Sequence, residues 1–137
     1  MTPVEVAVGL ELPSLQIRFT RGDLVRYAGA SGDFNPIHWS DRAARELGLS
    51  SVIAHGMLTM GAALRVVTDW LDDPGRVLSY AVRFTKPVVV PDADTGALVT
   101  VGATVTAVHD QVATLTLDVR CGDTKVLGAA TVEVRVG

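Results

Sequence analysis

The sequence predicts an α+β domain in which a strongly bent antiparallel sheet wraps around one long central helix. Its 137 residues suffice for one domain with a full core but not for two, so a single domain is expected over residues 1–137. The segment from His55 to Leu71 has almost no polar face, which is typical of a helix covered on several sides. After Arg76 apolar and polar residues alternate, which indicates strands with one buried face.

The N-terminal part of the chain predicts a strand followed by a helix. Residues 1–14 are mixed in character and predict an irregular arm, whereas alternation over residues 14–20 predicts the first strand. Thr20 and Asp23 have the spacing of a capping box, so a helix is expected to run from about Arg21 to Ala30. The expected buried side of this helix consists of Leu24, Val25, Tyr27 and Ala28.

Turn residues and helix caps then divide the chain up to the end of the long helix. Residues 31–36, Ser-Gly-Asp-Phe-Asn-Pro, are typical of a turn. Ser40 is placed to cap a short helix over residues 41–47, and Gly48 is expected to stop it. The long helix is expected to end at residues 72–75, Asp-Asp-Pro-Gly.

The alternating residues after Arg76 predict four strands. Their apolar positions are Leu78, Tyr80, Val82 and Phe84; Val101, Ala103, Val105 and Ala107; Leu115, Leu117 and Val119; and Val132, Val134 and Val136. Turn signals at 91–94, His109–Asp110 and Gly122–Asp123 are expected to join them as an antiparallel meander. Because such a small sheet ends in exposed edges, we expect a dimer that joins two sheets edge to edge.

Composition and charge argue against several classes of protein. The net charge of −3 and the absence of any run of three basic residues argue against nucleic-acid binding. The single cysteine, Cys121, permits no internal disulfide and fits a reducing cytoplasm, and the N-terminus lacks the positive segment of a signal peptide. Residues 47–64 carry no Asp, Glu, Lys or Arg, but three glycines and His55 favour a helix with its entry loop over a membrane span. No membrane segment is therefore expected.

Side chains suited to chemistry gather on the loop before the short helix. Asp33, Asn35 and His38 lie within six residues, and Pro36 fixes one backbone angle between them. If the loop folds back, a carboxylate and an imidazole reach one water molecule, which is an arrangement for general acid–base catalysis. Asn35 would orient the carboxylate or the water without titrating. At the start of the long helix, Gly56 offers a backbone N–H that would stabilise a carbonyl oxygen gaining negative charge.

Each of these residues also has a plainer structural interpretation. The Asp-x-Asn-Pro sequence is a common turn signature. His55 against an apolar helix is typical of a hydrogen-bonded core residue, and Gly56 and Gly61 would permit close packing of helix and sheet. Three histidines without metal-ligand spacing and one cysteine predict no metal site. With no G-x-G-x-x-G and no P-loop motif, we expect no cofactor.

Three motifs together resemble the MaoC-like family of (R)-specific enoyl-thioester hydratases and dehydratases. Residues 27–38, YAGASGDFNPIH, resemble the hydratase motif of that family, although Ala30 stands where a larger aliphatic residue is usual. Residues 54–57, AHGM, resemble the second motif at the start of the central helix, and residues 83–88, RFTKPV, resemble the third. Within the family, the HWSD and AHGMLTMG stretches most resemble the catalytic β subunit of actinobacterial (3R)-hydroxyacyl-ACP dehydratases.

The resemblance implies a hot-dog fold and a hot-dog dimer. It implies that Asp33 and His38 hold the water that is added or expelled and that Asn35 supports them. The Gly56 N–H would then bind the thioester carbonyl. The implied reaction is the reversible interconversion of (3R)-hydroxyacyl and trans-2-enoyl thioesters, with the acyl group on coenzyme A or on an acyl carrier protein.

Two other functions use the same fold. The chain could be the partner or acyl-binding subunit of a hetero-oligomeric dehydratase, although its Asp33, Asn35 and His38 favour an active member. A hot-dog thioesterase would instead hydrolyse the acyl group. The residues leave open the acyl-chain length, the carrier, the direction, which of Asp33 and His38 is the base, and whether the partner is a second copy.

Overall fold

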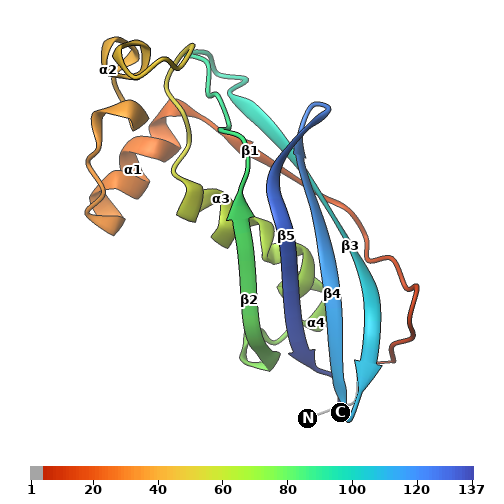
Figure 1. Ribbon diagram of the computed structural model, residues 1–137. Coiled ribbons are helices and arrows are strands. Elements are labelled where there is room, and N and C mark those ends of the chain that lie inside the picture. Colours follow the sequence, from red (N-terminus) through yellow and green to blue (C-terminus); the bar gives the residue numbers. More distant parts are fainter. Residues whose placement is uncertain (1–4) are drawn as a thin grey trace.

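The computed structural model describes residues 5–137 and contains one antiparallel sheet of five strands (Figure 1). The strand order is β1-β3-β4-β5-β2, and every neighbouring pair is antiparallel. The strands are β1 (Leu15–Phe19), β2 (Val77–Phe84), β3 (Ala97–His109), β4 (Val112–Cys121) and β5 (Thr124–Arg135).

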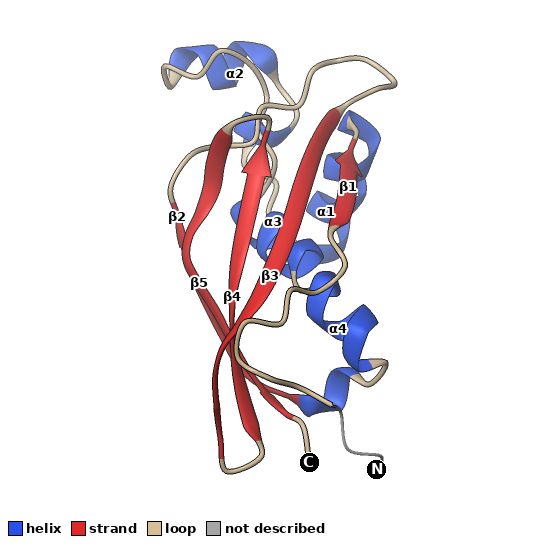
Figure 2. Ribbon diagram, turned by 90° about the vertical axis from the view of Figure 1, so that its right-hand side faces the viewer, coloured by secondary structure: helices blue, strands red, loops and turns tan. Residues whose placement is uncertain are grey.

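The helices lie on one face of this sheet, with α2 beyond its end (Figure 2). They are α1 (Arg21–Ser31), α2 (Asp41–Glu46), α3 (Gly56–Ala63) and α4 (Arg65–Leu71), with 3-10 turns η1 (Pro36–His38) and η2 (Pro74–Arg76). One apolar core joins Val66, Val67 and Leu71 of α4 to the inward side chains of the sheet, such as Val101 and Leu115. The predicted α+β domain with a bent antiparallel sheet around a central helical element is therefore confirmed. No helix within residues 5–137 has both the length and the apolar character needed to cross a bilayer.

The caps predicted before the long helix are present. The Thr20 hydroxyl accepts the Asp23 N–H while the Asp23 carboxylate accepts the Thr20 N–H, which completes the capping box of α1. The Ser40 hydroxyl accepts the Ala43 N–H at the start of α2. The prediction that Val25 lies on the buried side of α1 was wrong. Val25 is 59% exposed, because α1 turns Leu24 and Ala28 toward the core.

Residues 5–14 form the predicted irregular arm, and residues 1–4 of that prediction lie outside the described part of the chain. The arm follows β3, because Gly9 and Leu12 donate their N–H groups to the carbonyls of Val105 and Ala103. Leu12 is buried in the core.

The predicted four-strand meander is wrong for β2. β3, β4 and β5 form consecutive hairpins, with residues of positive φ at both turns, but β2 pairs with β5 at the far edge of the sheet. Alternation shows that a segment is a strand but not which strand it pairs with. The connection over residues 85–96 is longer than a hairpin turn and leads from β2 past β5 and β4 to β3, which lies beside the opposite edge strand β1. The outer side of β2 consequently pairs with no strand among residues 5–137.

Bulges also interrupt the expected alternation. The first shift of the β2–β5 register, between Val77 and Ser79, adds a residue to β2, and Leu78 is 47% exposed. The second shift, between Ala81 and Arg83, adds a residue to β5 instead. Phe84 therefore keeps the predicted face of β2, with its ring against Gly56 of α3, and is 56% exposed at the end of this edge strand. The β3–β4 register shifts after Val105, and Ala107 is exposed rather than buried.

The predicted helix from His55 to Leu71 is divided into α3 and α4 at Leu64. The Leu64 N–H bonds to the Ala62 carbonyl, so the Met60 carbonyl, its partner in a regular helix, accepts the Tyr80 hydroxyl at 2.8 Å. Burial raises the pKa of Tyr80 to about 12, which keeps the hydroxyl a donor. Leu64 keeps right-handed helical dihedrals, so α4 follows α3 directly.

Replacing Tyr80 by phenylalanine is expected to lower the free energy of unfolding by about 1 kcal/mol, because the Met60 carbonyl loses its donor. Urea unfolding of both proteins at neutral pH measures the change. An unchanged midpoint would mean that water replaces the hydroxyl at the helix joint.

Candidate active site

The loop between α1 and α2 is built from short-range hydrogen bonds. Gly32 ends α1 with a φ of 78°, a left-handed conformation that glycine adopts readily. The Asp33 carboxylate then accepts the Asn35 N–H at 3.2 Å, and the Asn35 side chain accepts the Ile37 N–H at 3.3 Å. With Pro36 at its first position, η1 follows and turns His38 into the interior, where it is buried.

The loop brings Asp33 and His38 together. His38 Nε2 lies 3.7 Å from Asp33 Oδ2, and His38 Nδ1 lies 2.7 Å from the Ile53 carbonyl. Because a carbonyl oxygen only accepts, Nδ1 carries a proton, and the Nε2 of a neutral His38 presents its lone pair toward Asp33. The side chain of Asp33 is 51% exposed in the single chain, whereas that of His38 is 8% exposed.

Asn35 contacts this pair in a way that the sequence did not reveal. Its backbone N–H, rather than its side-chain amide, bonds to the Asp33 carboxylate, while the amide oxygen caps η1. The residue thus fixes the carboxylate through the turn that it initiates.

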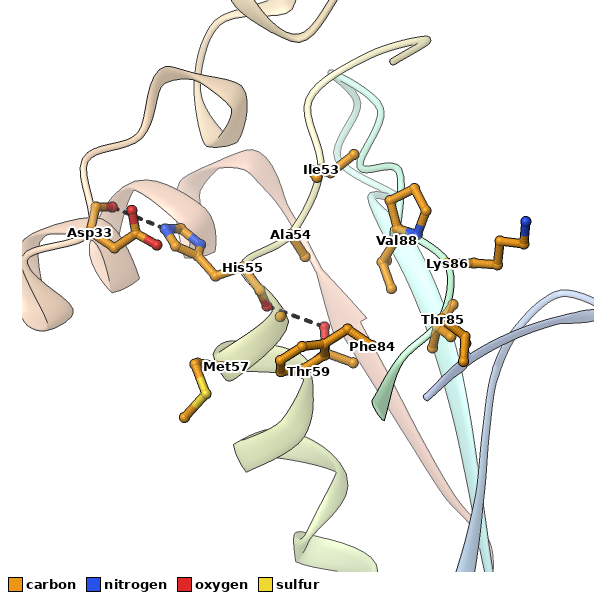
Figure 3. A pocket seen from close by; sticks show the side chains of 13 residues that line it. Asp33, Ile53, Ala54, His55, Met57, Thr59, Phe84, Thr85, Lys86 and Val88 are labelled. Atoms are coloured by element: carbon orange, nitrogen blue, oxygen red, sulfur yellow. Dashed lines mark hydrogen bonds between the residues drawn. The ribbon is translucent and has the colours of Figure 1, made fainter. Parts of the chain in front are cut away.

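His55 lies against both members of the pair. Its Nε2 donates to the Asp33 backbone carbonyl at 3.2 Å (Figure 3). Its ring stacks on His38 with centroids 3.7 Å apart and planes 20° apart, and Tyr27 meets it edge-on at 4.7 Å. The sequence interpretation placed His55 in the core, and it is 1% exposed, but its contacts with the pair were missed. The available signals were a polar residue at the start of an apolar helix and its place in the second motif, residues 54–57.

Asp33, His38 and His55 offer three potential ligand atoms within 4.8 Å of one another, which the sequence spacing did not suggest. An imidazole nitrogen binds a metal in the plane of its ring. The two histidine planes are nearly parallel and stacked, so their lone pairs do not converge on one ion. We therefore assign no metal to this cluster.

A pocket of about 410 Å³ opens beside these residues. It is lined by Asp33, Ile53, Ala54, His55, Gly56, Met57, Thr59, Phe84, Thr85, Lys86, Pro87, Val88 and Val126 (Figure 3). Eight of these thirteen residues are apolar or glycine, and His38 is not among them. The second and third sequence motifs therefore supply most of the wall. Lys86 extends away from Asp33 and His55, toward the outside (Figure 3).

Gly56 is the first residue of α3, and no side chain caps this helix. Because His55, Gly56 and Met57 line the pocket, the positive end of this helix lies beside it. A Cβ atom at Gly56 would lie 2.9 Å from the Phe84 ring, whereas one at Gly61 would meet nothing within 4 Å. A side chain at position 56 would therefore displace the Phe84 ring, whereas position 61 has room for one.

A polar network holds the segment that leads to His55. The Asp41 carboxylate accepts the Ser51 hydroxyl at 2.8 Å and the Val52 N–H at 3.1 Å, and it pairs with Arg21 at 3.0 Å. Arg21 also donates to the Val90 carbonyl. The Ser51 and Val52 hydrogen bonds, with the Arg21 ion pair, lower the pKa of Asp41 to about 2. The network fixes the residues that precede Ile53, whose carbonyl orients His38.

Asp41→Asn is expected to destabilise the protein most at neutral pH. Because the folded-state pKa is below the ordinary value of 3.8, the stabilisation is present above pH 4 and is lost as the pH falls toward 2. Urea unfolding from pH 7 to pH 2 should show the two proteins converging at the acidic end. Asp69→Asn, which breaks an exposed pair with Arg65, is the control and should change stability by less than about 0.5 kcal/mol. A constant difference across the pH range would contradict the role of the ionised carboxylate.

Comparison with known proteins identifies a family that the chain matches. A family described as "MaoC like domain" matches residues 7–123. The 3-hydroxyacyl-thioester dehydratase X of Mycobacterium tuberculosis is 43% identical over 79 residues, which are 58% of this chain and 27% of that protein. An (R)-specific enoyl-CoA hydratase of Rhodospirillum rubrum is 31% identical over 125 residues, covering 88% of this chain and 83% of that one.

A solved structure described as a MaoC-like dehydratase superposes with a TM-score of 0.94 at 41% identity, covering 99% of this chain and 43% of that chain. The chain thus spans less than half the length of this protein and of the M. tuberculosis dehydratase.

Proposed function

The chain belongs to the family of MaoC-like domains, and from this premise we propose that it catalyses the reversible hydration of trans-2-enoyl thioesters to (3R)-hydroxyacyl thioesters. The predicted family and its hot-dog fold are confirmed. The main observation in support of this activity is that His38 Nε2 lies 3.7 Å from Asp33 Oδ2, beside a largely apolar pocket.

In the proposed dehydration, one member of the pair removes a proton from C2 of the hydroxyacyl group. The pair then gives a proton to the C3 hydroxyl, the C3–O bond breaks, and water leaves. His38 Nε2 is suited to carry the proton, since Nδ1 is already held by Ile53. Asn35 is proposed to support the pair through its backbone N–H. Protons and water are the only groups exchanged, so the chemistry requires no redox cofactor.

Gly56 is proposed to bind the thioester carbonyl through its N–H. Removing the C2 proton places negative charge on that oxygen, and a helix N-terminus in an apolar pocket stabilises such charge. The walls formed by Ala54, Met57, Val88 and Val126 would contact the acyl chain.

The proposed substrates are acyl groups on coenzyme A or acyl carrier protein, and the proposed assembly is a dimer of hot-dog subunits. The outer edge of β2, which pairs with no strand among residues 5–137, supports the dimer, as do the exposed Leu78 and Phe84 on that strand. The partner is a second copy or another hot-dog chain. A reducing cytoplasm is proposed because the single cysteine, Cys121, can form no internal disulfide. The proposed single domain comprises residues 1–137.

The test is the purified chain with crotonyl thioesters of coenzyme A and of acyl carrier protein. Hydration consumes the conjugated enoyl absorbance and yields the (3R) product without free thiol. Release of free thiol would instead identify a thioesterase, and neither reaction would refute the proposal for the isolated chain.

A second function, that of a partner subunit, is favoured by one observation: Asp33 is half exposed in the single chain, and it lines a pocket together with Phe84 of the edge strand β2. The oligomer mass and activity of the chain, alone and co-expressed with other MaoC-like chains, separate the two. Activity of a homodimer would contradict a purely supporting role.

A further inference from the structure

We propose that His55 is a positioning residue that holds Asp33 and His38 in the mutual arrangement needed for proton transfer. The inference rests on the proposed hydration activity for its kinetic consequence. It assigns a role to a buried side chain that the proposed chemistry does not use.

The contacts of His55 join the two residues. Through Nε2–H it bonds to the backbone carbonyl of Asp33, which lies 22 positions earlier in the chain. With its ring it covers one face of His38 at a centroid distance of 3.7 Å. One side chain thus restrains the backbone that carries the carboxylate and the plane of the imidazole. Without it, the exposed loop around Asp33 would depend on its own turn hydrogen bonds.

The other ring nitrogen of His55, Nδ1, lowers the stability of the fold. His55 Nδ1 is buried and has no hydrogen-bond partner among the described residues. An unsatisfied buried polar atom destabilises the fold, so an apolar side chain would serve better if only space had to be filled. The position requires both a flat ring against His38 and an N–H donor toward the Asp33 carbonyl. Histidine supplies both.

The charge of His55 also suits this role. The titratable groups that contact its ring or its nitrogen belong to His38 of η1, Asp33 of the loop and Tyr27 of α1. Burial lowers the pKa of His55, against the raising effect of the hydrogen bond to Asp33. His55 therefore stays neutral and places no like charge against His38 when His38 holds a proton.

Two variants separate the donor from the ring. His55→Gln keeps an N–H donor and loses the ring, whereas His55→Phe keeps a flat ring and loses the donor. We expect His55→Phe to lower kcat for enoyl-thioester hydration by about 10- to 100-fold with little change in KM, since a displacement of about 1 Å has effects of this size. His55→Gln should recover part of the lost kcat.

Val67→Ala is the matched control, since Val67 is fully buried in α4. It should lower the melting temperature and leave kcat within about threefold of wild type. A folded His55→Phe protein with unchanged kcat would overturn the proposal. So would a control that, at equal loss of melting temperature, loses as much kcat.

A measurement on the wild-type protein needs neither variant nor turnover. The ring nitrogen signals of His55 in a ¹⁵N NMR spectrum should report the neutral Nε2–H form at pH 7 to 8. A charged His55 or an Nδ1–H form would overturn the proposal even if the chain is an active hydratase. If the chain does not hydrate enoyl thioesters, the proposed function fails. The NMR result still decides whether His55 donates its Nε2–H to the Asp33 carbonyl.

Discussion

Replacing Asp33 by asparagine or His38 by alanine is expected to lower kcat for hydration of a short trans-2-enoyl thioester by about 10²- to 10⁴-fold, the usual contribution of general acid–base groups. Asp33→Asn keeps an oxygen for the Asn35 N–H but loses the negative charge beside His38 Nε2. His38→Ala removes the imidazole that bonds to Ile53. Because the two groups act on one proton path, the double variant should be little worse than the poorer single variant.

The chain supplies a matched control for these substitutions. His109 and Asp110 form a second histidine–aspartate pair, 3.1 Å apart, on the exposed β3–β4 turn. Their side chains are 89% and 86% exposed, and neither lines the pocket. His109→Ala and Asp110→Asn should therefore leave kcat unchanged. Near-normal turnover in folded Asp33→Asn and His38→Ala proteins would refute the assignment of the catalytic pair.

The parts of the site that the sequence predicts are those fixed by neighbours in the chain. The capping box of Thr20 and Asp23, the Ser40 cap and the turn at Asp33 each involve residues two or three positions apart. Such interactions depend on local spacing, which the sequence displays directly. The approach of Asp33 to His38 follows from the same loop, because Asn35 and Pro36 start the turn that returns the chain.

What the sequence did not predict depends on contacts between distant segments. The bond from His55 to Asp33, the pairing of β2 with β5 and the bond from Tyr80 to Met60 each join parts of the chain with no common local pattern. The exposure of Leu78 follows from a bulge in β2, which apolar alternation does not reveal. These contacts decide how the wall of the pocket is assembled.

Gly56→Ala is expected to lower kcat/KM by about 10²-fold while changing the stability of the fold by less than about 1 kcal/mol. The added methyl group lies at the end of α3, where the thioester carbonyl is proposed to approach the N–H. It also lies 2.9 Å from the ring of Phe84. That ring is 56% exposed, so it can turn aside at low cost, and the fold should tolerate the change. Steady-state kinetics and urea unfolding of the same preparation measure the two effects.

Gly61→Ala is the control, because it adds the same methyl group to the same helix where nothing lies within 4 Å. It should leave kcat/KM unchanged and stabilise the protein by up to about 1 kcal/mol, as alanine favours the helix. Adding Phe84→Leu to Gly56→Ala then distinguishes the two causes of lost activity. If the smaller side chain restores turnover, the displaced ring had obstructed the pocket, and the N–H is not the reason for the glycine. Persistent loss in the double variant supports a carbonyl that must reach the backbone of α3.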